Sequence, residues 1–303
     1  MLRTIADIGK KLEKRKQKVT LVATAVQDEN VLKAVLEARD RDVVDILLIG
    51  NEQKIRQMAE TSGADLSGIS IINEEDDYKA GIDSVKLVHD NRAHILMNGQ
   101  ENYHGYAVLG RAVIDREYGI RRGQRISHFA LFELESYHKL IGITDCVMNV
   151  NPDLKTKAAI ISNAVFFMRV LGVENPKVAV LAAVEVVNES MPVTMEAAML
   201  SKMAQRGQIK NCTVEGPLAF DNAISKEHAI HKGIVNDVSG DPDILLAPDV
   251  ETAGMIYQSF VFFSKAKVAS LALGATVPIV LTSKLDSHET RVNSILLAAS
   301  LYA

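Results

Sequence analysis

The sequence predicts an α/β protein in which mostly parallel sheets lie between layers of helices. From Val19 onward, short apolar runs rich in β-branched residues alternate with longer amphipathic stretches, which is the rhythm of βαβ units. One pair of strand-like runs lies too close together for a helix between them, so the sheets are expected to be mixed. With 303 residues the chain is also long enough for two cores of ordinary size.

The first part of the chain alternates regularly between strand and helix patterns. Strands are predicted at 19–25, 43–50, 69–72 and 93–99, and helices at 29–39, 53–61 and 76–89. Asp28 and Asn51 stand where the N-caps of the first two of these helices are expected.

The pattern changes near Gln124. The runs 126–134 and 139–145 have only Glu135 to His138 between them, which predicts an antiparallel hairpin. A long helix should run from Asn151 to about Leu171, with Pro152 in its first turn. Further strands are predicted at 178–184, 212–216, 244–249, 268–273 and 278–282, and further helices at 192–206, 221–231 and 250–264. A final helix is expected from Asp286 to about Tyr302, with one buried face.

Composition and charge exclude several classes of protein. A net charge of −4 argues against a nucleic-acid partner, and the basic run 10–18 is interpreted as a solvated helix face. No stretch approaches the roughly 18 apolar residues of a membrane span, and the N-terminus has no signal-peptide core. Two cysteines are too few for a disulfide framework, so a cytoplasmic location is expected.

Neither thiol chemistry nor a metal is expected. Cys146 and Cys212 lie in no CxxC motif and beside no histidine, so a thiol nucleophile is not predicted. Glu227, His228 and His231 share one short segment, but no further cluster of ligands is visible, so no metal site is predicted.

Three polar turns recur on the apolar scaffold of the last third of the chain, at 214–223, 247–255 and 281–287. Each follows or lies close to a strand-like run and leads into a helix-like one. Such turns present free backbone N–H groups and the positive end of a helix dipole, which suits an oxyanion. Together they predict a phosphorylated substrate or cofactor.

These turns read VEGPLAFDNAIS, APDVETAGMIY and LTSKLDS, and with TDCVMNVNPDL at 144–154 they resemble the phosphate acetyl/butyryltransferase family. The resemblance spans roughly residues 18–303 and is closest to the phosphate butyryltransferase branch, the branched-chain phosphotransacylases. It implies two α/β/α domains with an inter-domain cleft, as in isocitrate and isopropylmalate dehydrogenases. It also implies that the final helix packs on the first domain, which places that domain at 1–124 plus 284–303 and the second at 125–283.

The resemblance implies a reversible conversion of acyl-coenzyme A and inorganic phosphate into acyl phosphate and free coenzyme A. The acyl group would be short, straight or branched, such as butyryl, and attack on the carbonyl would be direct, without an acyl-enzyme. Coenzyme A, acyl-coenzyme A and phosphate would be substrates, with no permanently bound cofactor. The expected partners are therefore small molecules, not nucleic acid or membrane, and the family forms homodimers or larger homo-oligomers.

The same resemblance points to Ser283, Lys284 and Asp286 as catalytic residues. Ser283 would contact the developing oxyanion. Lys284 replaces the family's arginine and keeps its charge without its bidentate fork. The acetyltransferase branch has a general-base aspartate where this chain has Thr290, so Asp286 is the candidate base, with capping of the final helix as its alternative role.

The remaining candidates would bind phosphate or coenzyme A. Arg111 is the anion-binding candidate in a segment that departs from the family, since Asn98 stands where a lysine is usual and about three residues are inserted. For Ser127 the alternative is an ordinary strand hydroxyl, and for Asp221 and Asp249 it is a helix cap. For Asp145 it is a turn that caps itself. The predicted binding residues are Arg111, Ser127, Asp145, Asn149, Gly216, Pro217, Asp221, Pro248, Asp249 and Thr252.

Other functions stay open. The reduced cationic character of the site is what a non-catalytic acyl-coenzyme A sensor of the same fold would show. A phosphate acyltransferase dependent on acyl carrier protein would need a basic docking patch, which the sequence does not clearly contain. A dehydrogenase of related architecture would need a set of carboxylates for a divalent metal, and none is identifiable.

Overall fold

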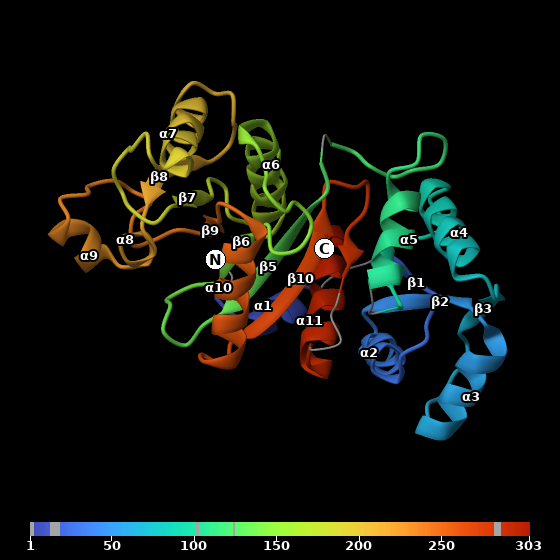
Figure 1. The fold of residues 1–303 in the computed structure, drawn as a ribbon. Coiled ribbons are helices and arrows are strands. Elements are labelled where there is room, and N and C mark those ends of the chain that lie inside the picture. The colour runs from blue at the N-terminus through green and yellow to red at the C-terminus, as the bar shows by residue number, and fades with distance from the viewer. Residues whose placement is uncertain (1–2, 13–18, 101–102, 124, 282–285) are drawn as a thin grey trace. The chain divides into compact units, whose positions relative to one another are not determined.

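The computed structural model describes residues 3–12, 19–100, 103–123, 125–281 and 286–303 (Figure 1). The chain forms two compact units: unit 1 comprises 1–5 and 124–268, and unit 2 comprises 6–123 and 269–303. Both contain strands flanked by helices, mostly in parallel pairs, which confirms the predicted fold class.

Unit 2 is built on a mostly parallel sheet. Its strands are β1 (Val19–Thr24), β2 (Val44–Gly50), β3 (Ser70–Asn73), β4 (Ile95–Asn98), β11 (Ile279–Val280) and the larger part of β10 (Lys267–Leu273). The order β3-β2-β1-β4-β11 is parallel throughout, and β10 is antiparallel to β11. The helices that accompany these strands are α1 (Ile5–Leu12), α2 (Glu29–Asp40), α3 (Glu52–Ser62), α4 (Asp77–His89), α5 (Tyr103–Val113) and α11 (His288–Ala299), with a 3-10 turn at Ser300–Tyr302.

Side-chain caps explain where helices α2 and α3 begin. The Asp28 carboxylate accepts from the Asn30 amide at 2.8 Å, and the Asn51 side chain accepts from the Lys54 amide at 2.9 Å. Both predicted N-caps are therefore confirmed.

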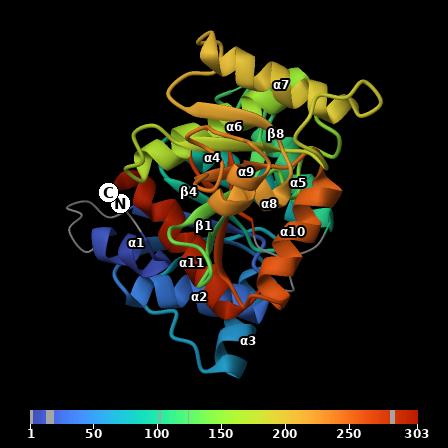
Figure 2. The ribbon, with the colours of Figure 1, turned by 90° about the vertical axis from the view of Figure 1, so that its left-hand side faces the viewer.

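The terminal helix differs from its prediction in two ways. Ser287, not Asp286, is the N-cap, since its hydroxyl accepts from the Thr290 amide at 3.0 Å. The prediction of one buried face is also wrong, because every residue from Thr290 to Ala299 is buried. The helix contacts both α2 and β11, so more than one of its faces is covered, and Figure 2 shows α11 beside α2.

Unit 1 contains the predicted hairpin. Its strands are β5 (Ser127–Glu133), β6 (Ile141–Thr144), β7 (Lys177–Leu181), β8 (Thr213–Leu218) and β9 (Ile244–Leu246), in the order β5-β6-β9-β7-β8. Strand β5 is antiparallel to β6, and the other neighbours are parallel. The helices are α6 (Leu154–Val170), α7 (Pro192–Gln205), α8 (Phe220–Ile224), α9 (Lys226–His231) and α10 (Val250–Phe262).

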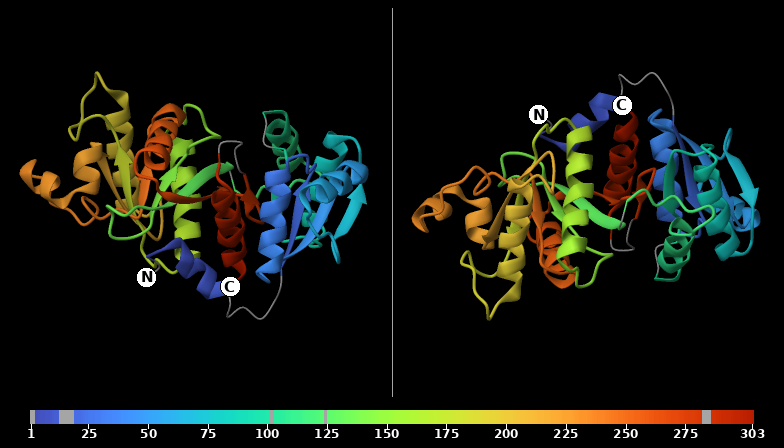
Figure 3. Two further views of the ribbon diagram at one scale, coloured as in Figure 1. Left: turned by 90° about the horizontal axis from the view of Figure 1, so that it is seen from below. Right: turned by 90° about the horizontal axis from the view of Figure 1, so that it is seen from above.

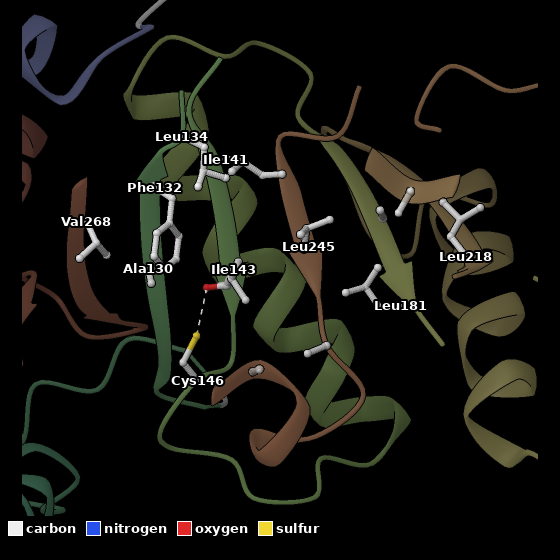
Figure 4. Close-up of a cluster of buried hydrophobic side chains, with 14 of the residues drawn as sticks. Ala130, Phe132, Leu134, Ile141, Ile143, Cys146, Leu181, Leu218, Leu245 and Val268 are labelled. Atoms are coloured by element: carbon white, nitrogen blue, oxygen red, sulfur yellow. Dashed lines mark hydrogen bonds between the residues drawn. The ribbon is translucent and has the colours of Figure 1, made fainter. Parts of the chain in front are cut away.

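Strand β5 shows how the two faces of the unit 1 sheet are covered. Phe129 packs on Phe167 of α6 with ring centroids 5.4 Å apart. Phe132, on the other face by the alternation of a strand, packs on Tyr257 and Phe260 of α10 at 5.2 and 5.3 Å. Helices α6 and α10 therefore cover opposite faces (Figure 3). Figure 4 shows part of the core on the α10 side, in which the Cys146 thiol lies 3.7 Å from the Ile143 carbonyl oxygen.

Two helix boundaries in unit 1 differ from expectation. Helix α6 begins at Leu154, because the Asp153 carboxylate accepts from the Thr156 amide at 2.8 Å and makes Asp153 the N-cap. Pro152 therefore precedes the cap. The single helix predicted at 221–231 is two short helices, since Ser225 adopts an extended backbone and caps α9.

The division into units also differs from the predicted domain bounds. The chain returns to unit 2 at residue 269, not at 284, and residues 1–5 belong to unit 1. The physical reason for the earlier return is strand pairing: β11 pairs with β4 and β10 pairs with β11, so both continue the unit 2 sheet.

A cluster of charged side chains around a buried Lys139–Asp243 pair lies where β6, β7 and β9 begin. The Lys139 ammonium, with its side chain 7% exposed, lies 2.7 Å from Asp243 and 2.8 Å from Asp241. Lys177 and His138 also pair with Asp241, at 2.6 and 2.7 Å. Burial by itself would raise the pKa of the Asp241 carboxyl, but the hydrogen bonds from Lys139, Lys177 and His138 outweigh it and place that pKa below its usual range.

Replacing Asp243 by alanine should destabilise unit 1 by about 3 kcal/mol, because removal of one partner leaves the buried Lys139 charge incompletely paired. The measurement is the free energy of unfolding from urea denaturation. Asp237→Ala, at an exposed residue of the same unit, is the control and should change it by less than about 0.5 kcal/mol. Equal small effects in both variants would contradict the assigned role of the cluster.

Candidate active site

Strand direction brings most of the predicted binding residues of unit 1 to one edge of its sheet. The parallel strands β6, β7, β8 and β9 end at this edge, and the antiparallel β5 begins there. We call it the carboxyl edge of unit 1. In open α/β sheets, ligands bind outside the carboxyl ends of the strands. The predicted residues on or directly after these strand ends are Ser127, Asp145, Asn149, Gly216, Pro217, Asp221, Pro248, Asp249 and Thr252.

Asp145 organises the loop that follows β6. Its side chain is buried, and one carboxylate oxygen accepts from the Val147 and Met148 amides at 3.0 and 2.9 Å. The other oxygen accepts from the Asn149 side-chain amide at 2.6 Å, and that amide also donates to the Ile126 carbonyl at 2.9 Å. The peptide bond before Asp145 is cis. Asp145 and Asn149 therefore hold the loop to the start of β5.

Ser127 opens β5 and is bound to α6. Its side chain is 1% exposed, and the hydroxyl oxygen accepts from the Asn163 side-chain amide at 2.9 Å. A hydroxyl that accepts one hydrogen bond keeps its proton as a donor. In the described structure Ser127 therefore joins β5 to α6.

The turn after β9 places a helix N-terminus next to the Asp145 loop. Asp249 is the N-cap of α10 and accepts from the Thr252 amide at 2.7 Å. The Val250 amide donates to the Val150 carbonyl at 3.1 Å, which ties this turn to the loop after β6. Pro248 and Thr252 are both half-buried on the same turn. The capping alternative for Asp249 is therefore confirmed, and its carboxylate stands at an end that favours anions.

Glu185 follows β7 and Asp221 follows β8, and the ammonium group of Lys232 pairs with both carboxylates. Asp221 is not the cap of α8, since Ala219 precedes that helix, and its carboxylate instead lies 3.1 Å from the Lys232 ammonium. Lys232 also lies 3.1 Å from Glu185. The hydrogen bond from Lys232 is the main reason why the pKa of the Asp221 carboxyl is below its usual range.

Gly216 and Pro217 lie within β8 and are joined by a cis peptide bond. A side chain at residue 216 would place its Cβ 2.8 Å from Val180 Cβ, so the close approach of β7 and β8 requires glycine. Gly216 therefore allows these two strands to pack closely.

The predicted residues of unit 2 are described only in part. Ser283 and Lys284 lie outside the described residues. Asp286 is half-buried, and its carbonyl oxygen accepts from a guanidinium nitrogen of Arg291, a side chain that is 2% exposed. Arg111 is exposed in the last turn of α5.

At the end of β4, an amide replaces the expected cationic residue. Asn98 is buried, and its side-chain amide donates to the Gln100 carbonyl at 2.5 Å, so it holds its own turn. The Gln100 side chain in turn donates to Asp77. The Asp77 carboxylate also accepts from Gln27 at 2.8 Å. At residue 98 the described structure therefore has a neutral amide where the family resemblance implied a positive charge.

Several residues that complete these contacts were not predicted from the sequence. Asn163, Lys232, Arg291 and Asp77 each belong to a helix or a helix end with an ordinary amphipathic pattern. Only the fold shows which strand end each of them meets. Among the described residues, no cluster of three or more His, Cys, Asp or Glu side chains could hold a metal ion. Over the same ranges, no helix is long and apolar enough to cross a membrane.

Comparison with known proteins assigns the family. Residues 4–85 and 77–299 match the model of the Phosphate acetyl/butaryl transferase family, and the chain belongs to this family, as predicted. It is 42% identical over 299 residues to the phosphate butyryltransferase of Clostridium acetobutylicum, covering 99% of this chain and 98% of that protein. It is 40% identical over 279 residues to the phosphate acetyltransferase of Thermotoga maritima, covering 92% and 94%.

A solved structure is similar over nearly the whole fold. The branched-chain phosphotransacylase from Enterococcus faecalis V583 superposes with a TM-score of 0.83 at 27% identity, covering 94% of this chain and 99% of that one. A 4-hydroxythreonine-4-phosphate dehydrogenase from Klebsiella pneumoniae shares the fold at 12% identity with a TM-score of 0.58. The predicted kinship with dehydrogenase architectures is thus confirmed at the level of the fold.

Substitutions at Asp249 should show how much its cap hydrogen bond stabilises the turn after β9. Asp249→Ala is expected to lower the free energy of unfolding by about 1 kcal/mol, whereas Asp249→Ser, which can still cap, should stay within about 0.5 kcal/mol of the wild type. Thermal or urea unfolding measures both. If the serine variant is as unstable as the alanine variant, the cap hydrogen bond is not what stabilises this turn.

Proposed function

We propose that this protein reversibly transfers a short acyl group, butyryl or branched, between coenzyme A and inorganic phosphate. The observation that carries the proposal is the 42% identity, over 99% of the chain, to a protein named phosphate butyryltransferase. The match to a branched-chain phosphotransacylase over 94% of the chain supports the same acyl size. Coenzyme A and phosphate act as substrates, and no permanently bound cofactor takes part.

The proposed reaction is a direct displacement. A phosphate oxygen forms a bond to the thioester carbon, the carbonyl becomes a tetrahedral oxyanion, and the carbon–sulfur bond then breaks. The departing thiolate takes up the proton that the attacking hydrogen phosphate gives up and leaves as free coenzyme A, while the acyl group remains on phosphate. In reverse, the thiol loses that proton and attacks the acyl phosphate. The enzyme aligns the two substrates and stabilises the oxyanion.

The roles of the residues are proposals as well. Ser283 donates to the oxyanion, Lys284 and Arg111 bind phosphate, and Asp286 exchanges the thiol proton. Thr290 is unsuited to act as the base, because its hydroxyl is not basic at neutral pH. That hydroxyl also lies 3.0 Å from the hydroxyl of the capping Ser287. The carboxyl edge of unit 1 contributes polar groups for acyl-coenzyme A. By the family resemblance, the active form is a homodimer or larger homo-oligomer.

The environment of the two thiols supports direct attack over an acyl-cysteine intermediate. Burial, aided by the charge of Asp145, raises the pKa of the Cys146 thiol well above its usual range. Burial also raises the pKa of the Cys212 thiol to about 11. Since the thiolate is the nucleophilic form, neither residue is prepared to accept an acyl group at neutral pH.

Removal of either thiol should therefore leave catalysis nearly intact. We expect Cys146→Ala and Cys212→Ala to keep kcat within about threefold of the wild type, whereas loss of a covalent nucleophile would remove almost all activity. The measurement is phosphate-dependent thiol release from butyryl-coenzyme A. A burst of thiol release that disappears in one variant would instead establish a cysteine acyl-enzyme.

The test of the function is phosphate- or arsenate-dependent release of free thiol from acetyl-, butyryl- and isobutyryl-coenzyme A. We expect four-carbon and branched substrates to be preferred. Ser283→Ala should lower kcat by about 100- to 1000-fold through loss of an oxyanion donor. Ser162→Ala is the matched control, because that hydroxyl is exposed and bonded within its own helix.

A second function has one specific observation in its favour. Asn98 is a neutral amide committed to its own turn, and it stands where the resemblance implied a lysine. A non-catalytic acyl-coenzyme A sensor would tolerate that change. Binding of coenzyme A without thiol release from any of the three substrates would reject the transferase and support the sensor.

A further inference from the structure

His128 stands next to Ser127 at the start of β5 and is not used by the mechanism above. Its side chain is 3% exposed, and its backbone carbonyl accepts from the Thr144 hydroxyl at 2.8 Å. The ring nitrogen Nδ1 is buried and has no hydrogen-bond partner among the described residues. A buried polar atom without a partner is costly and calls for an explanation, such as a missing ligand.

Strand geometry places this side chain at the carboxyl edge, on the α10 face of the sheet. Ser127 bonds to α6, so the next residue of the strand points to the opposite face. Phe132 lies on the same face as His128 and packs against α10. In the β5–β6 register, Phe129 is opposite Thr144, which puts His128 beside Asp145.

The charge state of His128 limits what it can bind. Burial lowers the pKa of the imidazole to about 4, although the negative charge of Asp145 opposes this shift. At neutral pH the ring is therefore uncharged and carries one N–H donor. Next to the Asp145 carboxylate, a phosphate dianion would be repelled, whereas a carbonyl oxygen would accept from this N–H without a charge penalty.

We propose that His128 is a substrate-binding residue whose Nδ1–H donates a hydrogen bond to a carbonyl oxygen of acyl-coenzyme A. The acceptor is the thioester carbonyl or an amide carbonyl of the pantetheine arm, which have the same hydrogen-bonding chemistry. The inference rests on the proposed function, since it assigns a contact with the substrate of that reaction. It also gives the buried Nδ1 the partner that the described residues do not supply.

Three substitutions test the contact. His128→Leu keeps an apolar side chain of similar reach and removes both nitrogens. It should lower kcat/KM for butyryl-coenzyme A by about 10- to 100-fold and leave the KM for phosphate unchanged. The melting temperature should stay level or rise, because an unpartnered buried nitrogen is gone. His128→Asn places an N–H near the position of Nδ1 and should keep more activity than His128→Gln, which mimics Nε2.

The kinetic parameters separate the two carbonyls. A fall in kcat indicates the thioester oxygen, because that bond strengthens as the oxyanion forms, whereas a rise only in the KM for acyl-coenzyme A indicates the pantetheine arm. His89→Leu, at an exposed histidine of α4, is the matched control and should stay within about twofold of the wild type.

Several outcomes would overturn the proposal. Activity of His128→Leu within about twofold of the wild type would show that no substrate contact exists. If His128→Leu raised the KM for phosphate as much as the KM for acyl-coenzyme A, the carbonyl oxygen of acyl-coenzyme A would be rejected as the acceptor. Activity kept by the Gln variant but lost in the Asn variant would reject Nδ1 as the donor.

Failure of the proposed function would be visible separately, as a wild-type protein that releases no thiol. In that case calorimetric titration with butyryl-coenzyme A still decides the contact. Weaker binding by His128→Leu than by the wild type supports it, and equal binding or no binding by either protein overturns it.

Discussion

Parallel pairing of strands is the constraint on which the rest of this structure depends. In unit 1, four parallel strands must end at one edge of the sheet, and the hairpin adds the beginning of β5 to that edge. Residues more than a hundred positions apart, such as Ser127 and Asp249, are therefore brought to the same side of the sheet. The turns that leave this edge begin helices or capped loops, so they also supply backbone N–H groups for an anion or a carbonyl.

The buried polar groups at the two edges of the unit 1 sheet differ in how fully they are hydrogen-bonded. Where β6, β7 and β9 begin, Lys139, Asp241 and Asp243 satisfy one another within the protein, as expected for charges that serve stability. At the carboxyl edge, Asp145 is also satisfied, but its neighbour His128 keeps a buried nitrogen without a partner among the described residues. An unpartnered nitrogen such as His128 Nδ1 does not add to stability, so a substrate that binds at this edge is the better explanation for it.

The described polar residues near the proposed site are mostly neutral or paired with an opposite charge. Asp221 and Glu185 are compensated by Lys232, and Asn98 supplies an amide to its own turn. His128 is uncharged at neutral pH. Binding of acyl-coenzyme A in unit 1 would then depend on directed neutral donors. Such donors suit a thioester carbonyl, which accepts hydrogen bonds and carries no charge.

The amino-acid sequence by itself determined the fold class, the positions of nearly all strands and the family, because hydrophobic periodicity, turn residues and four motif segments are local properties. Asp28 and Asn51 were assigned to caps, and a cap was the alternative role for Asp249, for the same reason, since a cap bonds within its own turn. The tertiary structure decided that the last helix is buried at every residue from Thr290 to Ala299. It also decided that Lys232 meets Asp221 and that His128 lies beside Asp145. These contacts join residues distant in the chain, and strand order and register, which no local pattern contains, bring them together.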